Sequence, residues 1–238
     1  MSRPDTSIST ISLSASTPAA TTPAVELVAD LSCPWCYVAF RRLRRLQREA
    51  SLVLVWQPFL LNPFLPQEGM ERGLYRSRKF GTLEASRRLD RRLVDVGEQE
   101  GIAFAFESIA RTPQTIAAHG LLLTAQRRGL IELATERLFA AMFTQGRDIG
   151  DPNELLREAR HLGLDWQPPA PGQPPPNAAS VLAAHDQACA AGVSGVPLLV
   201  FRPGLSIAGA QSLDALRAML DLARYRLRAE AGQGRQAS

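Results

Sequence analysis

Cysteine is scarce in this sequence, and long apolar runs are missing from it. Three cysteines in 238 residues are too few for a small secreted domain held together by disulfides. No run of about 18 apolar residues occurs, so the sequence predicts no membrane-spanning helix. Residues 1–24 are rich in Ser, Thr, Ala and Pro and lack the compact apolar segment of a secretory signal. We therefore expect a disordered N-terminal tail and a cytoplasmic protein.

Lysine and aromatic residues are also rare. The net charge of +4 arises from 26 arginines and one lysine against 23 acidic residues. Surfaces that bind nucleic acid interleave basic with aromatic side chains, whereas two arginine clusters here alternate with leucines, as in amphipathic helices with a solvated basic face. The clusters are Arg41, Arg42, Arg44, Arg45 and Arg48, and Arg87, Arg88, Arg91 and Arg92. We expect no nucleic-acid partner.

The chain does contain strand and helix patterns on either side of a helical block. Apolar runs at 25–31 and 52–59, joined by a helical pattern at 36–49, predict two parallel strands and their connecting helix. Helical spacing follows in the middle of the chain at 82–100, 115–128, 131–143 and 152–162. Residues 167–177 contain six prolines and predict an extended linker. We then expect a helix at 178–191, strands at 196–201 and 205–208, and a final helix from its N-cap, Ser212.

This order of elements is typical of an α/β protein with a thioredoxin-like fold and a large all-helical insertion between its two halves. We expect residues 25–61 and 178–230 to form the thioredoxin-like domain. Residues 62–177 would form the helical insertion domain, which ends in the proline-rich linker.

Two of the cysteines stand at the first strand-to-helix junction, as Cys33-Pro34-Trp35-Cys36. The unpaired N–H groups and the positive end of the helix dipole favour a thiolate at Cys33. Such sites lower a cysteine pKa from about 8.5 to roughly 3.5–7.5, and the first arginine cluster would add positive potential. Pro34 suits the first helical position, where an N–H has no helical partner. The motif favours a redox-active pair that exchanges disulfides.

Several segments carry a resemblance to a known family. They are Asp30-Leu31-Ser32-Cys33-Pro34-Trp35-Cys36-Tyr37, Leu61-Asn62-Pro63, Arg111-Thr112-Pro113, Ala118-His119, Gly146-Arg147-Asp148-Ile149, Gly192-Val193-Ser194-Gly195-Val196-Pro197 and Ser206-Ile207-Ala208-Gly209-Ala210-Gln211. With them the chain resembles the DsbA family of thioredoxin-like oxidoreductases, and within it the FrnE-like branch, over residues 25–220.

The resemblance implies a thiol–disulfide oxidoreductase or isomerase in which Cys33 attacks and Cys36 resolves the mixed disulfide. It also implies a cis peptide bond before Pro197, facing the pair. The residues expected to bind or shape the substrate are Pro34, Trp35, Val196, Pro197, Asn62 and His119. The partners would be protein or small-molecule thiols and disulfides. Glutathione is a candidate co-substrate, no other cofactor or metal is expected, and a homodimer stays open.

Three polar residues have two interpretations each. Asp30 is either a proton acceptor near the thiols, or a strand-end cap or solvent-facing acid. Asn62 and His119 either line a cleft or act as capping or core-edge groups. Cys189 lies on the helical face that also carries Leu182, and we expect its small thiol to pack in the core.

Other functions compete with disulfide exchange. Cys33, Cys36, His185 and Cys189 would form an acceptable zinc ligand set, although that site leaves the Val196-Pro197 segment unexplained. Glutathione-dependent transferases of the kappa type and chromene-carboxylate isomerases share the fold, but they generally have serine at the leading position. A holdase chaperone with an apolar cleft is a further alternative.

Overall fold

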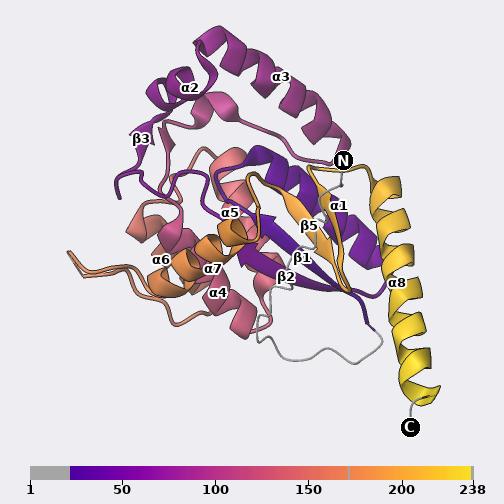
Figure 1. Cartoon of the computed structure of the whole chain (residues 1–238). Helices are drawn as coiled ribbons and strands as arrows, with labels where there is room; N and C mark the ends of the chain where they lie inside the picture. Colours follow the sequence, from indigo (N-terminus) through magenta and orange to yellow (C-terminus); the bar gives the residue numbers. More distant parts are fainter. Residues whose placement is uncertain (1–21, 171, 237–238) are drawn as a thin grey trace, which may run out of the picture.

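A four-stranded sheet lies at the centre of the computed structural model, which describes residues 22–170 and 172–236 (Figure 1). The strand order is β2-β1-β5-β6, and β1 pairs parallel with β2 and antiparallel with β5. The bounds are β1 Ala24–Ala29, β2 Val53–Pro58, β5 Leu198–Phe201 and β6 Leu205–Ala208. The predicted parallel pair is confirmed. The predicted tail lies outside the described residues except for its last three, of which Ala24 begins β1.

Two helices cover one face of this sheet. α1 (Pro34–Glu49) connects the parallel strands, and α8 (Leu213–Gln236) packs beside α1 and against β5, along one side of the molecule in Figure 1. Side chains alternate between the faces of a strand. Leu27 therefore joins the main core, whereas Val28 packs with Ala188 of α7 on the opposite face. Ser212 accepts from the N–H of Ala215 and caps α8 as predicted.

The segment between β2 and β5 is helical as expected, except that two short strands pair antiparallel within it, so the insertion is not all-helical. Its elements are β3 Met70–Glu71, α2 Arg72–Phe80, α3 Leu83–Gln99, a 3₁₀ turn Phe106–Ser108, β4 Arg111–Thr112, α4 Ile116–Arg127, α5 Ile131–Phe143, α6 Pro152–His161 and α7 Ala178–Ala190. The four helices predicted here lie within one residue of α3, α4, α5 and α6 at each end. The sequence did not predict α2, a helix of nine residues in which no residue is buried.

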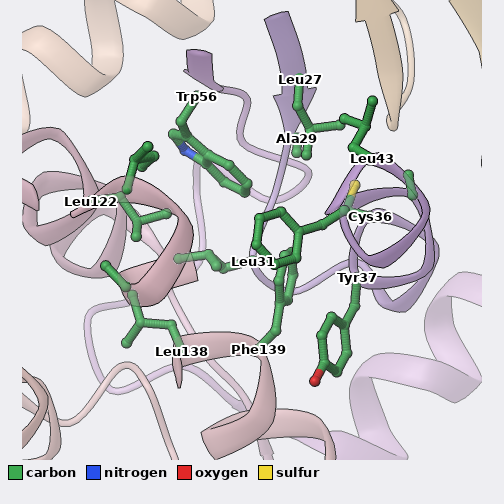
Figure 2. Packing of buried hydrophobic residues seen from close by; sticks show 14 of the residues in the cluster. Leu27, Ala29, Leu31, Cys36, Tyr37, Leu43, Trp56, Leu122, Leu138 and Phe139 are labelled. Atoms are coloured by element: carbon green, nitrogen blue, oxygen red, sulfur yellow. The ribbon is translucent and has the colours of Figure 1, made fainter. Parts of the chain in front are cut away.

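The main core joins α1 to the helical segment. Tyr37 of α1 stacks on Phe139 of α5 with ring centroids 4.9 Å apart, and Trp56 of β2 meets the same ring edge-on at 6.0 Å. Figure 2 shows Cys36 drawn within this cluster, and the Tyr37 hydroxyl directed away from it. That hydroxyl donates to Glu136 at 2.7 Å. The second cysteine of the pair is thus built into the packing of the protein.

Several arginines of α1 are engaged in ion pairs. Arg42 and Arg45 lie 2.8 and 3.0 Å from the carboxylate of Glu100, and Arg41 lies 2.9 Å from Glu136. The Arg42 side chain is only 13% exposed. The expectation of a solvated basic face is therefore wrong for Arg42, whereas Arg41 and Arg45 remain 32% and 42% exposed. All three charges connect α1 to the end of α3 or to α5.

The proline-rich linker contains no helix or strand in its described part, as predicted. Its end is attached to α4, because Asn177 Nδ2 donates to the carbonyl oxygen of Gly120 at 2.9 Å. The domain boundaries at 61/62 and 177/178 remain predictions. Within the described ranges, no helix combines the length and apolarity that crossing a bilayer requires.

Candidate active site

Cys33 and Cys36 occupy the N-terminus of α1 in the predicted arrangement. Cys33 is the N-cap residue, with extended backbone at φ −100° and ψ 111°, and Pro34 follows in the first turn. The N–H of Cys36 donates to the carbonyl oxygen of Cys33 at 3.0 Å. Cys33 is 6% exposed and Cys36 is fully buried. Both are free thiols, and the first is the one nearer the surface.

The two thiols have opposite pKa shifts. The hydrogen bond from the Cys36 thiol is the largest effect and lowers the pKa of Cys33 below its ordinary value. Burial is the next largest and acts to raise this pKa, while the backbone N–H groups of Cys36 and Trp35 lower it further. Burial and the proximity of Cys33 raise the pKa of Cys36 far above its ordinary value. The arginines of α1 are not among the main causes at Cys33. The expected arginine contribution is not found at Cys33, where short-range hydrogen bonds lower the pKa instead.

The segment before β5 faces the pair. The Cys33 thiol donates to the carbonyl oxygen of Val196 at 3.8 Å, a contact between residues 163 positions apart. The Val196–Pro197 peptide bond is cis. Pro197 is buried, and its carbonyl oxygen accepts from the N–H of Gly209 at 2.7 Å. The topology therefore brings Val196 against Cys33, although the two lie in different halves of the chain.

Asp30 lies beneath the pair and is 1% exposed. Its carboxylate accepts from the N–H of Ser32 at 2.9 Å and from the N–H of Leu61 at 2.6 Å. Burial acts to raise the pKa of Asp30, but the imidazole of His119 and these two N–H groups hold it below its ordinary value. Asp30 lies near the thiols, and its charge raises the pKa of both cysteines. Its hydrogen bonds to two backbone N–H groups fit the strand-cap alternative, and its role as a proton acceptor stays a prediction.

His119 of α4 completes this buried network. The indole N–H of Trp56 donates to His119 Nδ1 at 3.1 Å. Because an indole nitrogen can only donate, Nδ1 must accept, and the ring proton is assigned to Nε2. Nε2 lies 3.7 Å from Asp30 Oδ1, just beyond direct hydrogen-bond distance. His119 has no exposed surface, so the substrate contact expected from the sequence is not available to it, and the core-edge alternative fits.

The remaining predicted site residues belong to the rim of the site, by which we mean Pro34, Trp35, Val196 and Asn62. Asn62 accepts from the hydroxyl of Tyr75 at 2.9 Å, while its buried Nδ2 has no partner among the described residues. Trp35 is half-buried, and the guanidinium carbon of Arg92 on α3 lies 5.9 Å from its ring centroid. Sequence reasoning missed Tyr75 and Arg92. Tyr75 lies on the unpredicted α2, and Arg92 looked like one member of an arginine cluster.

The structure corrects the expectation for Cys189. This cysteine is exposed on α7, and its sulfur lies 3.7 Å from the nearer ring nitrogen of His185. The face shared with Leu182 is a surface face, since Leu182 is 39% exposed. Across the described ranges, no three His, Cys, Asp or Glu side chains gather as metal ligands would. The zinc alternative therefore lacks an assembled ligand set.

A thioredoxin-like sheet, a helical segment between β2 and β5, and a cysteine pair at the N-terminus of α1 define a thioredoxin-like protein of the DsbA type. A sequence model for the family described as the DSBA-like thioredoxin domain matches residues 24–221. The chain belongs to this family. No curated protein sequence matches the chain.

Solved structures have the same fold. The structure described as a probable DsbA oxidoreductase from Streptomyces coelicolor is 26% identical with a TM-score of 0.71, over 84% of this chain and 89% of that chain. A 2-hydroxychromene-2-carboxylate isomerase is 16% identical with a TM-score of 0.58, over 88% and 98%. The cytosolic disulfide reductase DsbM of Pseudomonas aeruginosa with GSH is 16% identical with a TM-score of 0.55, over 87% and 98%. The last two likenesses concern the fold alone.

Proposed function

We propose that this protein is a thiol–disulfide oxidoreductase that exchanges disulfides through Cys33 and Cys36. The observation that carries the proposal is the asymmetry of the two thiols. Cys33 has some exposed surface and a lowered pKa, whereas Cys36 is fully buried with a raised pKa. The thiolate is the attacking species in disulfide exchange, so this asymmetry assigns the nucleophile to Cys33 and the resolving thiol to Cys36.

In the reducing direction, the Cys33 thiolate attacks one sulfur of a substrate disulfide. The substrate S–S bond breaks, its other sulfur leaves as a thiolate, and a mixed disulfide joins Cys33 to the substrate. Cys36 then loses its proton and attacks Cys33 Sγ, which releases the second substrate thiolate and leaves a Cys33–Cys36 disulfide. Two electrons pass from the cysteine pair to the substrate. In the oxidising direction the same steps run in reverse, with substrate thiols as the electron donors.

The rim residues have roles in holding the substrate. Val196 faces the Cys33 thiol through its carbonyl group, and an extended substrate segment would lie along Val196 and Pro197. Pro34 and Trp35 shape the start of α1 beside the nucleophile. Asn62 stays a proposed substrate-binding residue, although its Oδ1 already accepts from Tyr75 and its Nδ2 is buried in this structure.

Further features of the proposal rest on the sequence alone. From the resemblance we assign the protein to the FrnE-like branch and to partners that are protein or small-molecule thiols and disulfides, with glutathione a candidate co-substrate. From the few cysteines and the composition of residues 1–24 we place it in the cytoplasm. A homodimer is compatible with this assignment. Transferases and isomerases of the same fold generally have serine at the leading position, so Cys33 with its lowered pKa favours disulfide exchange over those activities.

Single serine variants test the proposal. With a disulfide-containing protein as substrate, Cys33→Ser should abolish disulfide reduction, and Cys36→Ser should accumulate a mixed disulfide that gel electrophoresis without reductant detects. Cys189→Ser is the matched control and should keep full activity, because Cys189 lies on the surface of α7.

The pH dependence provides a second measurement. Because the pKa of Cys33 is lowered, its alkylation rate should rise to half its maximum at a pH below the ordinary cysteine value of about 8.5. An ordinary titration midpoint, together with no exchange with any dithiol, would overturn the assignment.

A further inference from the structure

α3 brings a positive charge to the redox motif. Trp35 lies in the first turn of α1, between the two cysteines, and the guanidinium carbon of Arg92 lies 5.9 Å from the centre of its ring. α3 packs against α1 and, with α2, forms one end of the molecule in Figure 1. Arg92 therefore reaches the rim of the site from a helix outside the central sheet.

The charge of Arg92 has no acidic partner within 4.0 Å among the described residues, and the residue is exposed. Three other basic residues of this region are paired, whereas Arg87 and Arg91 of α3, like Arg92, have no acidic partner within that distance in the described part of the chain. Arg72 and Arg76 both contact Asp90, and Arg88 contacts Glu84. A guanidinium over an aromatic ring engages the ring with its flat face. Its N–H groups lie in the guanidinium plane and point outward, so Arg92 can still bind a carboxylate.

The other residues at the rim are apolar or uncharged. Pro34, Trp35, Val196 and Asn62 carry no formal charge, and the charge of Asp30 lies beneath them, 1% exposed. A substrate that extends from Cys33 across Trp35 would therefore meet Arg92, whose guanidinium carbon lies 5.9 Å from the centre of the Trp35 ring. Exposed charge pairs contribute little on average, but a charge-assisted hydrogen bond to a guanidinium is stronger and directional.

We propose that Arg92 makes the site selective for disulfides that carry a carboxylate near the sulfur atoms. The carboxylate pairs with the guanidinium beside Trp35 while one substrate sulfur meets Cys33. This inference rests on the proposed disulfide exchange and adds the substrate class. The ligand chemistry is a carboxylate close to a disulfide, supplied either by a small molecule or by an acidic peptide segment.

Three small disulfides of similar size but different charge test whether the charge of the substrate changes its reduction rate. They are dithiodipropionate (anionic), hydroxyethyl disulfide (neutral) and cystamine (cationic). Pre-reduced protein, in a Cys189→Ser background, converts each in a single turnover to two thiols and a Cys33–Cys36 disulfide. We expect the protein with Arg92 unchanged to reduce dithiodipropionate faster than cystamine. Arg92→Gln should lower the rate constant for dithiodipropionate by about three- to tenfold and change that for hydroxyethyl disulfide less than about twofold.

The matched control is Arg87→Gln. Arg87 is exposed on the same helix, five positions earlier and therefore on a different face, and its loss removes the same net charge. It should leave all three rate constants unchanged, whereas Arg92→Lys should restore part of the preference for the anion. A high salt concentration should weaken the preference in the parent protein.

The outcomes separate the two proposals. Equal effects of Arg92→Gln on all three disulfides, or equal effects of Arg87→Gln and Arg92→Gln, would overturn the role of Arg92. If the parent protein reduces none of the three disulfides, the proposed exchange activity itself fails. Comparing an acidic with a neutral disulfide-bonded peptide then identifies the source of the carboxylate. A preference for dithiodipropionate without a preference for the acidic peptide assigns the site to small anions.

Discussion

Replacing Asp30 by asparagine should destabilise the protein by about 2–4 kcal/mol. The carboxylate accepts from two buried backbone N–H groups, those of Ser32 at 2.9 Å and Leu61 at 2.6 Å. Asparagine retains one oxygen, so one of these N–H groups would face an NH₂ group. The loss combines a charge-assisted hydrogen bond of about 1.5–3 kcal/mol with an unsatisfied buried donor of about 1–3 kcal/mol, two contributions that partly overlap. In a chain of this length the melting temperature should fall by roughly 4–16 °C.

The same substitution should lower the pKa of both thiols. The negative charge of Asp30 raises the pKa of Cys33 and of Cys36, and a neutral asparagine removes that effect. The variant should thus be less stable and yet ionise its cysteines more readily. A merely structural role of Asp30 would change the stability without moving the thiol titration in this direction.

The difference in stability between the parent protein and Asp30→Asn should change with pH in one direction. The pKa of Asp30 in the folded protein lies below its ordinary value of 3.8. Its contribution to stability is therefore fully present above 3.8 and is lost as the pH falls through the folded-state value. The gap between the parent protein and Asp30→Asn should be widest near neutral pH and should narrow as the pH falls below 3.8.

Urea unfolding followed by circular dichroism measures the stability of each variant, and thiolate absorbance in a Cys189→Ser background measures the cysteine titration. Asp186→Asn, at an exposed position on α7, is the matched control and should change neither. The reasoning is refuted if Asp30→Asn leaves the Cys33 titration midpoint unchanged or raises it, or if the variant is as stable as the parent near neutral pH.

Two further substitutions probe the surroundings of this network. Trp56→Phe removes the donor to His119 Nδ1 and should cost about 1–3 kcal/mol. Nitrogen NMR should show that the ring proton no longer prefers Nε2, and the same substitution should cost at least about 0.5 kcal/mol less in a His119→Leu background, because the two residues interact directly. Additive losses would contradict the Trp56–His119 hydrogen bond. Gly120→Ala should cost about 1–3 kcal/mol in thermal unfolding, because a Cβ there would clash with the carbonyl oxygen of Pro176 at the end of the linker. Gly195→Ala, where nothing lies within 4 Å of the added atom, is the control, and an equal loss there would contradict the steric explanation.

The sequence predicted the elements that are encoded locally. Strand and helix periodicity, the proline at the start of α1 and the serine cap of α8 are properties of neighbouring residues, and each is found in the structure. The positions of Cys33 and Cys36 follow from the same local pattern. Helices α3 to α6 were predicted to within one residue, because each is followed within three residues by a glycine with positive φ (Gly101, Gly129, Gly146 and Gly163).

The misassigned residues depend on longer-range contacts. Cys189 lies on α7, where alanines occupy both faces, so apolar periodicity cannot show which face is buried. His119 is buried because Trp56, 63 residues earlier, donates to its ring. Arg42 loses its solvent because Glu100, 58 residues later, lies beside it. Such pairings are set by the tertiary fold, and the pattern of neighbouring residues in the sequence does not predict them.

The roles of Cys33 as nucleophile and Cys36 as resolving thiol also follow from geometry, which residue types alone do not determine. Asp30 raises the pKa of Cys33 and of Cys36 in the same direction, so its charge alone does not explain why their shifts have opposite signs. The thiol–thiol hydrogen bond and the backbone N–H groups at the start of α1 favour the thiolate of Cys33, while burial and the nearby Cys33 disfavour that of Cys36. Replacing Asp30 should therefore shift both titrations and preserve their order, with Cys33 still the nucleophile. The choice of nucleophile depends on the position of each cysteine in the first turn of the helix.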